Sequence, residues 1–205
     1  FDPDPAVFST LEFNDKRIVE RLRQQAYLTK GIRMTFIDHR GTEDKDTKKA
    51  PKFLSFYFEG GLRAFVEHLA RGEQKLQEEI FHLHRDEGGK MEVEVAFLYM
   101  DDIETKEMSF ANNINTPDGG MHLTGFRSAL TRSINNYARA EGYLKGKDEN
   151  LTSDDTREGL VSIVSVRLPE PQFEGQTKAR LGNPEARTIT EMLVNEGLKE
   201  FLEKH

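Results

Sequence analysis

The sequence contains no cysteine and no run of apolar residues long enough to cross a membrane. Without cysteine the chain can form neither a disulfide bond nor a cysteine-ligated zinc site. A membrane-spanning helix needs about 20 consecutive apolar residues, and the first residues do not form a basic segment followed by an apolar one. Together these absences predict a cytoplasmic protein with no membrane partner.

Positive charge is also scarce in this sequence. The 29 Lys and Arg residues are outnumbered by 36 Asp and Glu residues, which gives a formal net charge of -7 and an isoelectric point of about 5.5. A protein that binds nucleic acid over a whole face is normally basic, so any contact with DNA must be local. With 205 residues, of which 36% are hydrophobic and 14 are Phe, the chain can bury a sizeable core, and one compact unit is the simplest expectation.

The sequence motifs of a self-sufficient active site are missing too. There is no phosphate-binding P-loop, no nucleophile elbow, no His-Glu-x-x-His zinc motif and no calcium-binding EF-hand loop. His82 and His84 would point to the same side of a strand and could supply two metal ligands, but no third ligand lies near them in the sequence. Polar residues at a strand edge are the favoured interpretation, and we expect no metal site.

Hydrophobic periodicity predicts a mixed α+β protein. Apolar residues at helical spacing, with Asn14 and Asn183 as N-caps, predict helices over 15–31, 61–69, 123–137 and 184–205, and the capping-box spacing of Thr152 and Asp155 predicts a single further turn. Alternating apolar residues predict strands over 32–36, 54–58, 80–84, 91–99, 106–115 and 160–168. The charged stretch 39–52 is expected to be a solvated hairpin loop. Because Glu92 and Glu94 alternate with apolar residues, the sheet is expected to have one wet side.

One polar segment, residues 172–178, lies between the last predicted strand and the last helix. Lys178 supplies an ammonium group with three donors, and Gln176 supplies an amide that can donate a further hydrogen bond. Such a pair could sense a terminal phosphate without cleaving it. An ordinary polar surface loop has the same composition, so both interpretations stay open at this point.

The long helix and its exit carry a local excess of positive charge. Between residues 123 and 147, five basic residues minus one acidic residue leave +4; they are Arg127, Arg132, Arg139, Lys145 and Lys147 against Glu141. A solvated helix face would show this pattern. So would a surface that contacts the DNA backbone through charge without reading sequence.

Longer motifs are distributed along the whole chain. They are FxPDPxxF at 1–8, SFANNINT at 109–116, GGxHLxGFR at 119–127, YAR at 137–139, KDxNLT at 147–152, REGL at 157–160 and LPEPQFEGQTK at 168–178. These motifs resemble the transducer domain found in the B subunits of type IIA DNA topoisomerases, and the gyrase type more than the topoisomerase IV type. The resemblance covers essentially the whole chain and assigns residues 1–205 to the transducer, the second domain of the ATPase region.

The resemblance implies a fold that neither composition nor periodicity could indicate. It is the GHMP-kinase-like sandwich, also seen in the second domain of ribosomal protein S-five, with a left-handed βαβ crossover. Such crossovers are right-handed in nearly all other proteins.

The resemblance also implies a function. Gln176 and Lys178 would contact the γ-phosphate of ATP, which is held together with Mg mainly by a preceding GHKL ATPase domain, so that no cofactor is expected in the isolated chain. Lys178 would stabilise that phosphate during catalysis and couple it to motions of the DNA gate. Arg127 matches the family's cavity-facing Arg, and Arg132 would face the transported DNA beside it.

The partners implied are the GHKL domain and the TOPRIM region of the same polypeptide, the gyrase A protein and double-stranded DNA. The isolated chain is expected to be monomeric and inactive, because the nucleotide pocket and the dimerising arm lie outside it. The nearest alternative is the same domain of the topoisomerase IV B protein. A GHMP-type small-molecule kinase would need a glycine-rich phosphate loop that is missing, and the net charge of -7 disfavours a stand-alone nucleic-acid-binding module.

Overall fold

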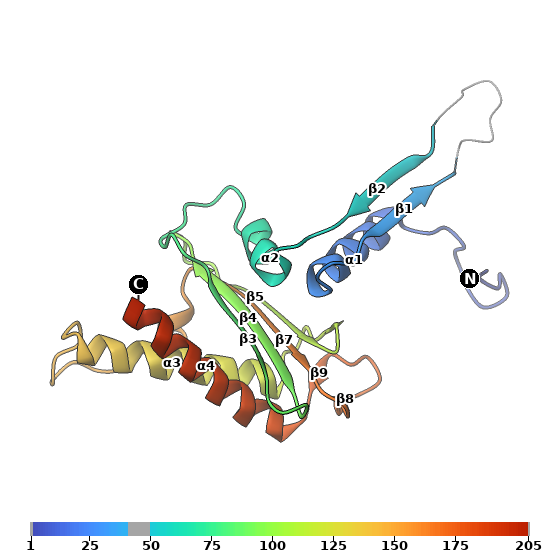
Figure 1. The fold of residues 1–205 in the computed structure, drawn as a ribbon. Helices are drawn as coiled ribbons and strands as arrows, with labels where there is room; N and C mark the ends of the chain where they lie inside the picture. The colour runs from blue at the N-terminus through green and yellow to red at the C-terminus, as the bar shows by residue number, and fades with distance from the viewer. Residues whose placement is uncertain (1, 41–49, 205) are drawn as a thin grey trace. The chain divides into compact units, whose positions relative to one another are not determined.

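The computed structural model describes residues 2–40 and 50–204, and the chain divides into two compact units, Phe1–Gly61 and Leu62–His205 (Figure 1). Length and composition favoured a single unit. Two form because the apolar residues of the first segment pack into a small core that includes residues from both its helix and its hairpin.

The first unit is a helix with a two-stranded hairpin. Its elements are α1 (Asp15–Leu28), β1 (Met34–Asp38) and β2 (Lys52–Phe56), and the two strands pair antiparallel. Asn14 caps α1 as predicted, because its side chain accepts a hydrogen bond of 3.1 Å from the Arg17 N–H. β1 begins later than predicted, since the Ile32 N–H still donates to the Thr29 carbonyl in the turn. Residues 41–49 of the expected solvated loop lie outside the described residues.

The second unit contains a five-stranded mixed sheet with the strand order β3-β4-β7-β5-β6. β5 and β7 run parallel, and the other neighbouring strands run antiparallel. The elements are α2 (Gly61–Leu69), β3 (Phe81–Asp86), β4 (Glu92–Tyr99), β5 (Lys106–Ala111), β6 (Ile114–Asn115), α3 (Met121–Ala140), η1 (Asp155–Arg157), β7 (Leu160–Arg167), β8 (Phe173–Glu174), β9 (Arg180–Leu181) and α4 (Pro184–Lys204). The mixed α+β class predicted from periodicity is confirmed.

Two segments of the second unit differ from the prediction. The strand expected over 106–115 is a hairpin, because Asn112 and Asn113 adopt the left-handed conformation, with φ of 49° and 62°, and reverse the chain between β5 and β6. Asn tolerates this conformation better than most residues. The segment 172–178, for which a polar loop was one interpretation, contains β8 and the turn that leads to β9, and these two strands pair antiparallel. The predicted capping box is present, since the Thr152 N–H donates to Asp155 and the Asp155 N–H to the Thr152 hydroxyl.

The long helices α3 and α4 lie side by side on one face of the sheet, and the main core fills the space between the helices and the strands (Figure 1). The helices approach closely at Gly125, where an added Cβ would lie 2.4 Å from the Arg187 carbonyl oxygen. Gly125 therefore makes the close crossing possible.

The opposite face of the sheet is wet only in part. Glu92 and Glu94 are half-buried, as expected, but Ala96 and Leu98 on the same strand are buried. Phe110 on this face meets the Phe65 ring of α2, with centroids 6.4 Å apart, so α2 covers that end. The prediction of one wet side is thus wrong at this end of the sheet.

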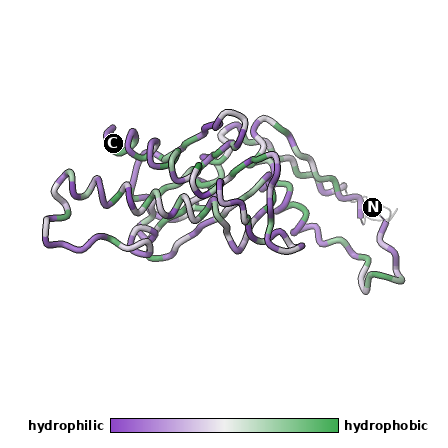
Figure 2. Tube along the Cα trace, turned by 90° about the horizontal axis from the view of Figure 1, so that it is seen from below, coloured by the Kyte–Doolittle hydropathy of each residue, from purple (hydrophilic) through white to green (hydrophobic). Residues whose placement is uncertain are grey.

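None of the described helices is long and apolar enough to span a membrane. Hydrophilic and hydrophobic residues alternate along the helices (Figure 2).

Candidate functional site

The segment with the predicted phosphate-binding residues forms the loop of the β8–β9 hairpin. Phe173 pairs with Leu181 and Glu174 with Arg180, and the loop between them carries Gln176 and Lys178. Both loop side chains belong to exposed residues. The structure therefore presents the amide and the ammonium group to solvent on one tight hairpin.

Lys178 has a defined conformation within this loop. Its φ is 55°, and its backbone N–H donates to the Gly175 carbonyl over 3.3 Å. The Nζ atom lies 5.6 Å from the centroid of the Phe173 ring, within the range of a cation–π contact. In the described part of the chain Lys178 forms no ion pair with a carboxylate, so its charge is available to an anion.

Arg127, the first of the predicted DNA-facing residues, forms an ion pair on the sheet. Its Nε and Nη2 atoms donate to the Glu107 carboxylate of β5, with the shortest distance 2.5 Å. Arg157 donates to the same carboxylate over 3.2 Å. The Glu107 side chain is only 7% exposed, whereas that of Arg127 is 38% exposed. The edge of the Arg127 guanidinium that carries Nε and Nη2 is thus fixed, and the side chain still reaches solvent.

The other arginines of the basic segment also have partners. Arg132 lies 2.5 Å from the Glu191 carboxylate of α4, and its side chain is 59% exposed. Arg139 donates to Asn150 and to the carbonyl groups of the loop after α3, which it holds in place. The local charge of +4 is therefore partly neutralised by Glu107 and Glu191, which come from outside residues 123–147.

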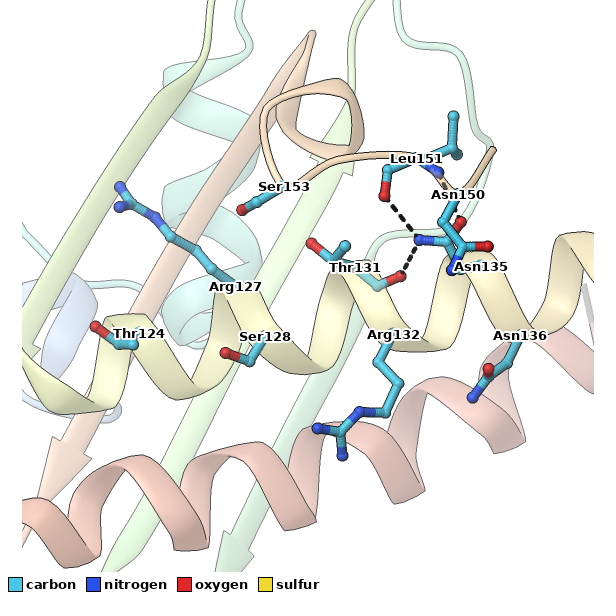
Figure 3. A pocket seen from close by; sticks show the side chains of 10 residues that line it. All are labelled: Thr124, Arg127, Ser128, Thr131, Arg132, Asn135, Asn136, Asn150, Leu151 and Ser153. Carbon is cyan, nitrogen blue, oxygen red and sulfur yellow. Dashed lines mark hydrogen bonds between the residues drawn. The ribbon is translucent and has the colours of Figure 1, made fainter. Parts of the chain in front are cut away.

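A groove of about 580 Å³ runs along α3 beside residues 150–153 (Figure 3). Arg127 extends toward the strands of the sheet and Arg132 toward α4, so the two cations stand at different edges of the groove (Figure 3). Asn135 holds the wall of the groove, because its Nδ2 donates to the Thr131 and Leu151 carbonyls, each over 2.9 Å. The lining is rich in guanidinium, amide and hydroxyl donors, which suit an anionic surface.

His82 and His84 lie on the same side of β3, as predicted, but each faces a carboxylate of β4. His82 Nε2 is 2.9 Å from Glu94, and His84 Nε2 is 2.6 Å from Glu92. Burial opposes ionisation of Glu92, but hydrogen bonds from His84 and Arg167 outweigh it and lower the pKa of this carboxyl. Among residues 2–40 and 50–204, no group of three or more His, Cys, Asp or Glu side chains is placed to hold a metal.

A buried polar cluster at the start of α3 was not predicted. His122 is fully buried and lies 3.4 Å from the Thr116 hydroxyl, which in turn is 2.7 Å from the Ser109 hydroxyl. Burial lowers the pKa of His122 to about 4, so the imidazole is neutral at pH 7. In the sequence only its place in the first turn of the helix hinted at this, because burial depends on strands that are distant in sequence.

Comparison with solved structures defines the class of protein. The 43K ATPase domain of gyrase B from Thermus thermophilus matches 98% of this chain, and the match covers 52% of that chain, with a TM-score of 0.81 and 41% identity. The ATP-binding domain of topoisomerase IV from Francisella tularensis matches 99% of this chain and 52% of its own, with a TM-score of 0.77 and 25% identity. The fold is that of type II topoisomerase B subunits.

Sequence comparison then identifies the family. A family model described as DNA gyrase B matches residues 61–205. The DNA gyrase B protein of Halalkalibacterium halodurans is 46% identical over all of this chain and 31% of the relative, and the topoisomerase 4 B protein of Enterococcus faecalis is 41% identical over all of this chain and 29% of the relative. The chain belongs to the DNA gyrase B family. It spans about a third of the length of these relatives.

Proposed function

We propose that the chain supplies the transducer module of a gyrase-type B protein, and that residues 62–205 carry this role. The module senses the γ-phosphate of ATP held by the preceding GHKL domain and passes the signal toward the DNA gate. The exposed Gln176–Lys178 hairpin is the observation that supports this most. The family model, which begins at residue 61, and the unit that begins at Leu62 support the narrower boundaries. The GHMP-kinase-like sandwich with its left-handed crossover belongs to the same proposal.

The hairpin residues fit a terminal phosphate. The Lys178 ammonium offers three donors and a full charge, and the Gln176 amide offers donors beside it. When bound, ATP supplies a terminal phosphate on which negative charge must be stabilised during hydrolysis. Mg is proposed to be held mainly by the GHKL domain, with the rest of the nucleotide site.

The groove on α3 is proposed to face the transported DNA. Arg127 and Arg132 would contact phosphates without reading bases, which positions a duplex but does not select its sequence. Engagement and release of the Lys178 loop would favour two different arrangements of the module, and this differential contact is what a two-state switch requires. The proposed partners are the TOPRIM region of the same polypeptide, the gyrase A protein and double-stranded DNA, in the cytoplasm.

The B protein of topoisomerase IV remains a second candidate, because a relative of that name is nearly as similar as the gyrase relatives. A stand-alone nucleic-acid-binding module is less well supported. The net charge of -7 disfavours a protein that binds nucleic acid over a whole face.

The sensing role predicts a large loss of turnover in the full-length protein that carries Lys178→Ala. A charge-assisted hydrogen bond to phosphate contributes about 1.5–3 kcal/mol, and more when charge grows in the transition state. ATP turnover is therefore expected to fall roughly 10- to 1,000-fold. Nucleotide affinity is expected to fall much less, since most nucleotide contacts belong to the GHKL domain.

The matched control is Lys90→Ala, which removes another exposed lysine, in the β3–β4 turn. The free energy of unfolding of both variants is expected to lie within about 0.5 kcal/mol of the wild-type value. Normal turnover in Lys178→Ala, or a loss of stability large enough to explain its lost activity, would refute the sensing role.

A further inference from the structure

The base of the β8–β9 hairpin is attached to the N-terminal ends of both long helices. On the α3 side the Asp118 N–H donates to Ala179 over 3.0 Å, and the Leu181 N–H donates to Gly119 over 3.2 Å. The approach is so close that a Cβ on Gly120 would lie 2.5 Å from the Leu181 backbone. This attachment consists of main-chain contacts.

On the α4 side one side chain, that of Asn183, adds to the main-chain contacts. Asn183 is 1% exposed. Its Oδ1 accepts from the Gln172 N–H over 2.6 Å, and its Nδ2 donates to the Glu170 carbonyl over 3.1 Å and to the Glu185 carboxylate over 2.7 Å. The amide thus binds the segment that enters β8 with both its donor and its acceptor.

This use of Asn183 is unusual for a helix N-cap. An N-cap side chain normally accepts a hydrogen bond from a backbone N–H in the first turn of its own helix. Here the Ala186 N–H donates to the Asn183 backbone carbonyl over 3.1 Å, and Pro184 has no N–H to satisfy. The side chain is therefore free to hold the hairpin.

Both backbone groups of Gln172 are hydrogen-bonded to the segment before α4. Its N–H donates to Asn183, and its carbonyl accepts from the Gly182 N–H over 2.7 Å. Phe173, whose ring lies beneath the Lys178 ammonium, follows directly. The position of the ammonium is therefore tied through Phe173 and Gln172 to Asn183, the residue directly before α4, a helix of 21 residues.

We propose that Asn183 is a positioning residue that fixes the Gln176–Lys178 hairpin to α4, so that a displacement of the hairpin moves the N-terminal end of this helix. The proposal rests on the sensing role of Lys178. Asn183 does not touch the phosphate and acts only through the hairpin. If the Asn183 amide is removed, the Gln172 N–H and the Glu170 carbonyl lose this partner, and the segment that enters β8 keeps only the bond from the Gly182 N–H to the Gln172 carbonyl on this side.

The test uses the full-length protein with Asn183→Ala, Lys178→Ala and the double variant. Asn183→Ala is expected to lower kcat for ATP about tenfold at a temperature well below unfolding, because a misplacement of about 1 Å can cost a hundredfold. KM for ATP is expected to change less than about threefold, since the contacts that bind ATP equally well in the ground state and the transition state are not altered. In the Lys178→Ala background, Asn183→Ala is expected to lower kcat less than about twofold further, because coupled residues are not additive.

The control is Asn195→Ala on the same helix. Asn195 accepts a hydrogen bond of 3.0 Å from Ser133 of α3, away from the hairpin, so its loss weakens α4 packing alone. The kcat of Asn195→Ala is expected to stay near the wild-type value. Asn183→Asp, which keeps the acceptor for Gln172 but loses the donor to the Glu170 carbonyl, is expected to retain more activity than Asn183→Ala, and it carries the same comparison if the alanine variant does not fold.

The outcomes distinguish the sensing role of Lys178 from the positioning role of Asn183. Unchanged turnover in Lys178→Ala refutes the sensing role. The positioning role is overturned if Lys178→Ala is impaired while both Asn183 variants behave like Asn195→Ala. It is also overturned if the losses of kcat in Asn183→Ala and Lys178→Ala multiply in full in the double variant.

Discussion

At the scale of single residues, Arg127 is the ion-pair partner of Glu107 and also the proposed DNA contact, and one substitution can separate the two roles. Arg127→Gln in the full enzyme is expected to weaken the stimulation of ATP turnover by DNA more than turnover without DNA, because a phosphate contact does not take part in the nucleotide chemistry. The same change leaves Glu107, which is almost fully buried, with Arg157 as its main partner. A loss of about 1–3 kcal/mol in unfolding free energy is therefore expected, measured by urea denaturation.

Arg132→Gln provides the comparison, since its ion pair with Glu191 is more exposed. Its loss is expected to cost less than about 1 kcal/mol. If DNA stimulation survives unchanged in Arg127→Gln, this arginine is a structural ion-pair partner and does not contact DNA.

The buried His122 predicts a dependence of stability on pH. Burial lowers its pKa from 6.5 to about 4, so the stability that it contributes is fully present above pH 6.5. Between pH 6.5 and 4 the unfolded chain takes up a proton that the folded chain does not, and the contribution is lost as the pH falls. From pH 7.5 to 5 the unfolding free energy is expected to drop by about 2 kcal/mol through this residue.

His122→Asn isolates this effect from the titration of carboxyl groups. The variant is expected to be less stable at pH 7.5, but its stability is expected to fall less steeply toward pH 5 than that of the wild type. Parallel pH profiles for the two proteins would show that His122 takes up its proton in the folded state as easily as in the unfolded one.

At the scale of whole elements, the packing of α3 on α4 depends on Gly125. Gly125→Ala places a Cβ 2.4 Å from the Arg187 carbonyl oxygen, which belongs to the backbone and cannot move aside easily. The helices must separate locally, and a loss of about 1–3 kcal/mol is expected in thermal or chemical unfolding. Gly146→Ala is the matched control, because no atom lies within 4 Å of the added Cβ. Equal stability of the two variants would contradict the close crossing.

Elements with a regular period could be predicted from the sequence, whereas irregular turns could not. The caps Asn14 and Asn183 and the apolar periods predicted all four long helical segments and the strands of the sheet, because burial imposes those patterns directly. The turn at Asn112 and Asn113 was missed because it interrupts an alternating pattern without a glycine. The β8–β9 hairpin was missed because each strand has two residues, too few to show a period.

The candidate site was predictable to the extent that its residues are local in sequence. Gln176 and Lys178 stand on one exposed loop, as their spacing indicated. The partners of Arg127 and Arg132 come from β5 and α4, so the charge of the α3 surface could not be read from residues 123–147 alone. The role of Asn183 in holding Gln172 was likewise hidden, since a cap residue in a sequence predicts a bond to its own helix.

At the scale of the whole molecule, the chain consists of two units and resembles only part of its longer relatives. We expect the isolated chain to be a monomer without ATPase activity, because the nucleotide site and the dimerising arm are assigned to other parts of the parent protein. An assay of phosphate release from ATP tests the absence of ATPase activity, and sedimentation velocity tests the monomeric state. Steady turnover of ATP above that of a heat-inactivated sample would contradict the assignment.

The parallel pairing of β5 with β7 also sets an order of folding. Lys106 of β5 aligns with Val161 of β7, and the chain between them includes all of α3. Closing so long a loop costs more chain entropy than closing the short turn between β3 and β4, and non-local pairings form slowly. The β3–β4 hairpin is therefore expected to form early and the parallel pairing of β5 with β7 late. Glu107 and Arg157 are 50 residues apart in the chain, so their ion pair is expected to form only in that late step.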